Sequence, residues 1–115
     1  MDNMRDFIYR KPRMTTGFQV EFVVGSVTFH GFCKDVGAAG IRAEFEDDLH
    51  EGSCGLLILR PRRGVLEIRS QVAYVEKCQV GLLFLFETAW EQRMTVDFIT
   101  GVLEDKGLPP LPAIP

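Results

Sequence analysis

Apolar and polar residues alternate in short segments over most of this chain, and this pattern constrains its fold more than any other feature. The first such segment covers residues 18–24, where Phe18, Val20, Phe22 and Val24 fall on one face. A period of two is typical of a β-strand that has one face in a core. Gly25-Ser26 follows and predicts a tight hairpin turn.

The alternation continues after this turn. Further strands are predicted at residues 27–34, 41–45, 56–59, 65–75 and 80–86, with turns at 35–40 and 60–64 and an acidic loop at 46–51. In the strand at 65–75, one face is predicted to hold Leu66, Ile68, Val72 and Tyr74. Residues 56–59 and 80–86 are apolar on both faces, so another element must cover their outer side.

A helix that starts at Thr88 is the predicted cover. Thr88 and Glu91 have the spacing of a capping box, and Gly107 is the predicted stop. The apolar stripe predicted to face the strands consists of Trp90, Met94, Phe98 and Val102. Prolines follow from residue 109 and exclude further helix.

Six short strands and one closing helix predict an all-β fold, a small six-stranded antiparallel β-barrel with one C-terminal α-helix, because closure removes exposed sheet edges. A length of 115 residues suits a single domain. We expect a basic N-terminal arm at residues 1–16, the barrel at 17–87, the helix at 88–107 and a Pro-rich tail at 108–115.

Composition and charge make several classes of function unfavourable. A net charge of -3 disfavours binding to a nucleic-acid polymer. The longest stretch without Asp, Glu, Lys or Arg has twelve residues, which predicts no membrane insertion, and the polar N-terminus indicates a cytoplasmic protein. The three cysteines are predicted to be buried thiols. His30 and His50 lie in no nucleophile or metal motif, so we expect exposed histidines, no enzyme, no catalytic or metal site and no cofactor.

More than half of the thirteen basic residues fall in two short segments, residues 5–13 and 60–63. Guanidinium groups form paired hydrogen bonds with phosphate and stack on bases. Clustered arginines in an acidic chain therefore suggest a specific small anion as ligand.

The sequence resembles the PilZ domains, bacterial receptors for the second messenger cyclic di-GMP. The resemblance covers residues 9–86. It depends on the arm Arg10-Lys11-Pro12-Arg13, the segment at residues 34–41 and the segment Gly81-Leu82-Leu83-Phe84. It implies a six-stranded barrel with a terminal helix, in agreement with the pattern of alternation.

The same resemblance implies a set of ligand-binding residues. PilZ domains carry an RxxxR motif that grips phosphates and a D/NxSxxG turn that reads guanine. Here the arm reads RxxR, with Tyr9 where the first arginine is expected, and the turn reads DxGxxG. The residues implied to bind cyclic di-GMP are Arg10, Arg13, Asp35, Gly37 and Gly40.

Three functions remain open at this point. The first is a single-domain cyclic di-GMP receptor that acts in signalling without catalysis. The second is a degenerate PilZ-like protein-protein adaptor that does not bind cyclic di-GMP, with an apolar outer face near Leu83 and Leu85. The third is an unrelated barrel that binds nucleic acid through Arg60, Arg62 and Arg63. The first two imply a protein partner, and the helix would pair with another copy, as a homodimer, if the barrel leaves its stripe uncovered.

Overall fold

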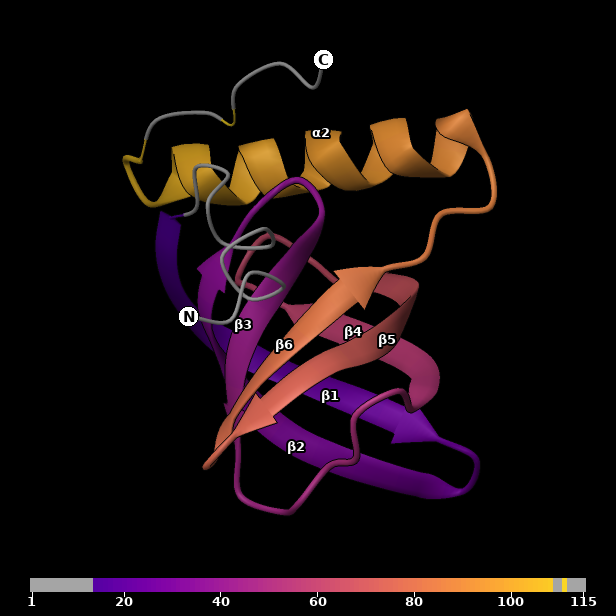
Figure 1. The fold of residues 1–115 in the computed structure, drawn as a ribbon. Coiled ribbons are helices and arrows are strands. Elements are labelled where there is room, and N and C mark those ends of the chain that lie inside the picture. The colour runs from indigo at the N-terminus through magenta and orange to yellow at the C-terminus, as the bar shows by residue number, and fades with distance from the viewer. Residues whose placement is uncertain (1–13, 109–110, 112–115) are drawn as a thin grey trace, which may run out of the picture.

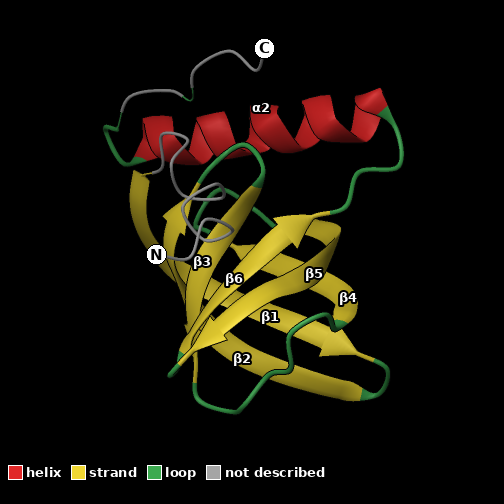
Figure 2. Ribbon diagram, viewed as in Figure 1, coloured by secondary structure: helices red, strands yellow, loops and turns green. Residues whose placement is uncertain are grey.

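The strands of this protein close into a barrel, and one helix lies across an end of it (Figures 1 and 2). The computed structural model describes residues 14–108 and residue 111. Its elements are β1 (Met14–Val24), β2 (Val27–Val36), β3 (Gly40–Phe45), β4 (Cys54–Arg60), β5 (Leu66–Glu76), β6 (Gln79–Phe84) and α2 (Ala89–Asp105). The strands run in the order β1-β2-β3-β6-β5-β4, and each pairs with its neighbours antiparallel. The predicted fold class is confirmed.

A single hydrophobic core fills the barrel and extends under the helix. Its fully buried members include Phe22 and Leu57 from the strands and Ile99 and Leu103 from α2. The strand residues come from alternate positions, as the period of two predicts. The core is thus built from the inward faces of the strands and one side of α2.

The hairpin at Gly25-Ser26 is confirmed, with Val24 opposite Val27 and Gly25 at a φ of +61°. The next turn is shorter than predicted. Asp35 and Val36 belong to β2, which leaves only residues 37–39 between β2 and β3. The predicted turn at 35–40 was wrong at both ends, because the register of β2 with β3 continues to the pair Val36 and Ile41.

Irregular pairing interrupts the alternation at three places, between Thr15 and Phe18, between Cys33 and Asp35, and between Val72 and Tyr74. An extra residue in one strand sends the following side chains to the opposite face. Val72 therefore points into the barrel, whereas Tyr74 pairs with Gly81 on the outer face. The prediction that Tyr74 shares a face with Val72 was wrong for this reason.

The predicted ends of α2 are confirmed. The Thr88 hydroxyl accepts a hydrogen bond from the Glu91 amide at 3.0 Å. At the other end, Gly107 has a φ of +72°, its amide donates to the Glu104 carbonyl, and the Leu108 amide donates to the Leu103 carbonyl. This pair of bonds is the Schellman arrangement, which satisfies carbonyls that the helix leaves unpaired.

The predicted core-facing stripe of α2 was wrong. Trp90 and Met94 are exposed by 65% and 50%, and the buried residues of α2 are Thr95, Ile99, Gly101, Val102 and Leu103. A step of four residues turns about 40° further round the axis than a full turn. A stripe drawn at steps of four therefore drifts, so that it begins on the solvent side at Trp90 and Met94 and reaches the core at Phe98 and Val102.

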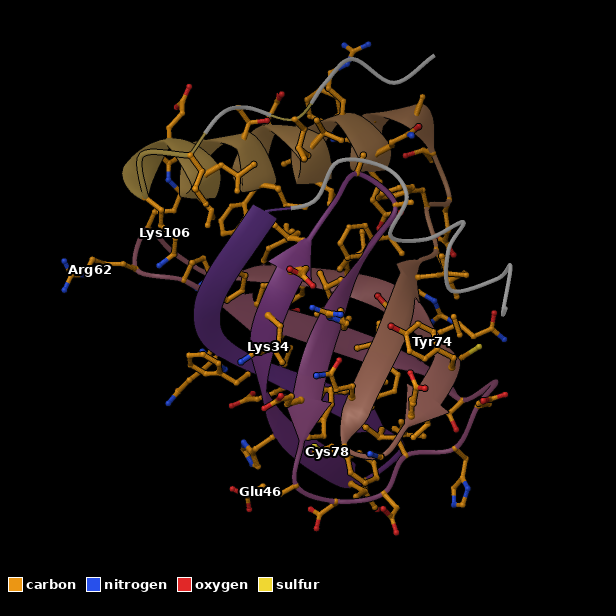
Figure 3. All side chains as sticks on the ribbon, turned by 60° about the vertical axis from the view of Figure 1, so that its left-hand side comes forward. Lys34, Glu46, Arg62, Tyr74, Cys78 and Lys106 are labelled. Carbon is orange, nitrogen blue, oxygen red and sulfur yellow. The ribbon has the colours of Figure 1, made fainter. Side chains whose placement is uncertain are left out.

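Two further predictions concern exposure. Cys33 is buried, but Cys54 and Cys78 are exposed, so the prediction of three buried thiols was wrong. Cys78 lies in the turn before β6, which Figure 3 shows at the end of the barrel away from α2. His30 and His50 are exposed as predicted. Within the described residues, no helix has the length and apolar character to cross a membrane.

Candidate functional site

Asp35 and Arg42 form an ion pair on the outer face of the barrel. They lie opposite each other on β2 and β3, one residue beyond the irregular pairing that turns Asp35 outward. An Arg42 Nη2 atom contacts Asp35 Oδ2. The Asp35 side chain is only 7% exposed and that of Arg42 is 29% exposed. The guanidinium is thus a fixed partner that orients the carboxylate.

This pair begins a row of outward residues across four strands. In register, Asp35 lies opposite Arg42, Arg42 opposite Gly81 on β6, and Gly81 opposite Tyr74 on β5. The Tyr74 ring occupies the space that a side chain at Gly81 would fill. The row therefore combines a carboxylate, a guanidinium, a stretch of bare backbone and an aromatic ring.

The turn between β2 and β3 carries the two glycines of the DxGxxG motif. The Gly37 amide donates a hydrogen bond to the Gly40 carbonyl at 2.9 Å, which closes the turn. Gly40 begins β3, and a Cβ there would overlap the Leu82 carbonyl of β6. Close approach of two strands, rather than an unusual φ, requires glycine at this position.

The chain enters the barrel beside this turn. Met14, the first residue of β1, lies opposite Val36, and Thr15 lies opposite Asp35. The predicted phosphate-binding residues Arg10 and Arg13 lie outside the described residues. The structure thus brings together Asp35, Gly37 and Gly40 at the point where the arm joins the barrel.

A groove on the outer surface of the barrel does not suit an anion. This groove, of about 520 Å³, runs along the outer faces of β1, β2 and β3, and its lining includes Glu21, Glu44 and Glu46. Lys34 pairs with Glu44 at 4.0 Å, and Glu21 lies 3.8 Å from His30 and 3.3 Å from Arg60. Three carboxylates along one groove would repel a phosphate-bearing ligand.

The arginines of the nucleic-acid hypothesis do not form one surface. Arg60 pairs with Glu21 at 3.3 Å on the outer face of β1, whereas Arg63 pairs with Asp105 of α2 at 2.8 Å. Arg62 extends into solvent from the turn between β4 and β5, near Lys106 (Figure 3). Two of the three arginines are paired with acidic residues on different elements. The three therefore do not form the cluster of cations that binding of nucleic acid would need.

Three residues of the outer row were missed from the sequence: Arg42, Gly81 and Tyr74. Arg42 alternates with the buried residues Ile41 and Ala43, and this pattern already places it outside the barrel. Its alignment with Asp35 could not be read from the sequence, because it depends on the irregular pairing after Cys33.

No protein-family model matches this sequence, and no curated protein does. Solved structures do match. The PilZ domain of CeSA from a cellulose-synthesizing bacterium is 12% identical, with a TM-score of 0.68 over 79% of this chain and 97% of that domain. The PilZ domain of YcgR from Escherichia coli with c-di-GMP is 15% identical, with a TM-score of 0.70 over 84% of this chain and 92% of that chain.

A longer YcgR structure from the same organism, in complex with c-di-GMP, gives a TM-score of 0.69 at 15% identity. The match covers 85% of this chain and 47% of that one. The closed six-stranded barrel, its strand order and its C-terminal helix are thus those of a PilZ domain.

Proposed function

We propose that this protein is a cyclic di-GMP receptor that binds its ligand on the outer face of the barrel and performs no chemistry. One observation carries the proposal. The basic arm joins the barrel at Met14, directly beside the ion pair of Asp35 and Arg42 and the turn at residues 37–39. Two YcgR structures of the same fold contain c-di-GMP.

Each residue of the site has a role that its chemistry suits. Arg10 and Arg13 would hold the phosphates through their guanidinium groups. Asp35 would accept hydrogen bonds from the N1 and N2 edge of guanine. Arg42 fixes the Asp35 carboxylate and adds a positive charge beside it. Gly37 has no side chain, so a base can approach the turn closely, whereas Gly40 allows β3 and β6 to approach each other beside the turn.

Binding would act through the position of the arm. A ligand held by arm arginines and by Asp35 at once would fix the arm against the barrel and change the surface that a partner protein meets. Protease cleavage of the arm measures this directly. We expect slower cleavage in the presence of cyclic di-GMP, and equal rates with and without it would contradict the mechanism.

Calorimetric titration of cyclic di-GMP into the purified protein tests binding itself. The test variants are Arg13→Ala and Asp35→Asn, and we expect each to weaken binding at least tenfold through a lost charged contact. Arg62→Ala is the matched control, since it removes an equal charge from an exposed site on the turn between β4 and β5. If Arg62→Ala weakens binding as much as Arg13→Ala, the ligand responds to overall charge and the site is wrong.

The adaptor function is the second candidate. It is favoured by the exposed Trp90 and Met94 on α2, since large apolar side chains in water often mark a protein interface. Leu83 and Leu85, expected to form an apolar surface, are only half-exposed. The absence of binding heat at millimolar ligand, together with an unchanged melting temperature, would replace the receptor proposal with this one.

A further inference from the structure

The side of α2 that faces away from the barrel carries two large exposed apolar side chains. Trp90 is 65% exposed and Met94 is 50% exposed. With about 100° between successive residues, Trp90 and Met94 lie roughly opposite Ile99 and Leu103, which are buried against the barrel. Exposure of Trp90 is therefore a consequence of where it lies on the helix and not of a loose fit to the core.

The C-terminal half of this same side carries a guanidinium. Arg63 reaches from the turn before β5 and lies over Gly101, where a Cβ would overlap it. Arg63 Nε donates to Asp105 Oδ2 at 2.8 Å, and this bond holds the guanidinium against the helix. One helix face thus presents an indole at one end and a fixed cation at the other.

We propose that this face binds a second copy of the chain, with two α2 helices antiparallel about a two-fold axis. Trp90 and Gly101 are separated by about 16 Å along the axis of α2. A two-fold axis midway between them brings Trp90 of each copy onto Arg63 of the other. An indole ring stacked on a guanidinium group forms a favourable cation-π contact. The two-fold axis generates two such contacts in the dimer.

Two charged residues of α2 are also compatible with this two-fold axis. Arg93 and Asp97 are both exposed. On the helix surface, Asp97 lies about 20° and Arg93 about 60° from Trp90, on the side away from Met94. In the antiparallel pair, Arg93 of one copy lies opposite Asp97 of the other. The barrel packs on the opposite side of α2 (Figure 1).

Sedimentation of the full chain from micromolar to millimolar concentration tests the proposal without any ligand, so its outcome is independent of the proposed function. We expect a monomer-dimer equilibrium in the wild type and at least a tenfold weaker one in Trp90→Ser and in Arg63→Glu. Phe32→Ser is the matched control, since Phe32 is an exposed aromatic residue on β2. Trp90 is the only tryptophan, so its emission should shift to the blue as the dimer forms.

A charge exchange tests the orientation. Arg93→Asp alone should weaken the dimer, and the double variant Arg93→Asp, Asp97→Arg should restore it, because both copies then carry the exchanged pair. Circular dichroism checks that each variant is folded. A wild type that stays monomeric at millimolar concentration would overturn the proposal, as would a dimer that Trp90→Ser and Arg63→Glu leave intact. In the first case the face would belong to a different partner.

Discussion

Asp35 contributes both to the packing of the barrel and to the proposed ligand site. It was predicted to lie in a turn, but it is a strand residue whose carboxylate contacts Arg42 on the neighbouring strand. A nearly buried carboxylate needs such a partner, since burial without one is costly. The partner also fixes the direction in which the carboxylate presents itself to a ligand.

Removal of Arg42 should therefore destabilise the protein. We expect Arg42→Ala to cost about 2 to 3 kcal/mol, near the lower bound for breaking a buried pair, because removal of the partly exposed Arg42 side chain lets water reach the Asp35 carboxylate that is left unpaired. The double variant Asp35→Ala, Arg42→Ala should be less destabilised than the sum of the two single variants by about 1 kcal/mol or more. Urea unfolding measures all three variants.

Lys34→Ala serves as the control for this cycle. Lys34 and Glu44 are 4.0 Å apart with side chains 39% and 41% exposed, so the loss of this pair should cost less than about 1 kcal/mol. Strictly additive costs for Asp35 and Arg42 would show that the two residues do not interact in solution.

Asp105 gives a prediction about pH. Its hydrogen bond from Arg63 holds the pKa of the Asp105 carboxyl below the ordinary value of 3.8. A lowered folded-state pKa stabilises the protein above the unfolded-state value, and the contribution disappears as pH falls through the folded value. An NMR titration should show the low pKa in the wild type and in Arg62→Ala, and the ordinary value in Arg63→Ala. An unchanged pKa in Arg63→Ala would contradict the pairing.

At the scale of the elements, the sequence predicts where strands, hairpin and helix lie but not always which way their side chains face. The alternation gives all six strands, and the spacing of Thr88 and Glu91 gives the start of α2. The outward position of Tyr74 could not be predicted, because a single extra residue between paired positions reverses all later side chains. The face of α2 was missed because a stripe at steps of four drifts round the axis.

Two glycines with crowded surroundings should respond in opposite ways to the same change. A Cβ at Gly40 would overlap the backbone of β6 at Leu82, which cannot move without breaking the sheet. A Cβ at Gly101 would meet only the Arg63 side chain, which can swing into solvent. We expect Gly40→Ala to cost at least about 2 kcal/mol. Gly101→Ala should be neutral or up to about 1 kcal/mol more stable, because alanine favours a helix.

Urea unfolding of the two variants measures this difference, and each is the control for the other. The Asp105 titration gives a second measurement for Gly101→Ala, since displacement of Arg63 should return the Asp105 pKa toward its ordinary value. A loss of stability in Gly101→Ala comparable to that in Gly40→Ala would show that Arg63 is fixed more firmly than a surface side chain.

At the scale of the whole molecule, the hydrophobic core and the proposed phosphate contacts use different parts of the chain. Among the described residues, the hydrophobic core begins at Phe18. It is closed by α2, and Leu108 and Leu111 pack against it. The proposed phosphate contacts lie in the arm, at Arg10 and Arg13. Folding and ligand binding should therefore be separable by truncation.

Removal of residues 1–13 should leave a folded barrel that no longer responds to cyclic di-GMP. At a ligand concentration 100 times Kd, the full chain should gain about 2.7 kcal/mol of stability, which for a domain of this size raises Tm by roughly 10 °C. The truncated chain should melt cooperatively within a few degrees of the ligand-free full chain and show no rise with ligand. An equal rise in both chains would place the ligand elsewhere on the barrel, and loss of cooperative melting would make the arm part of the fold.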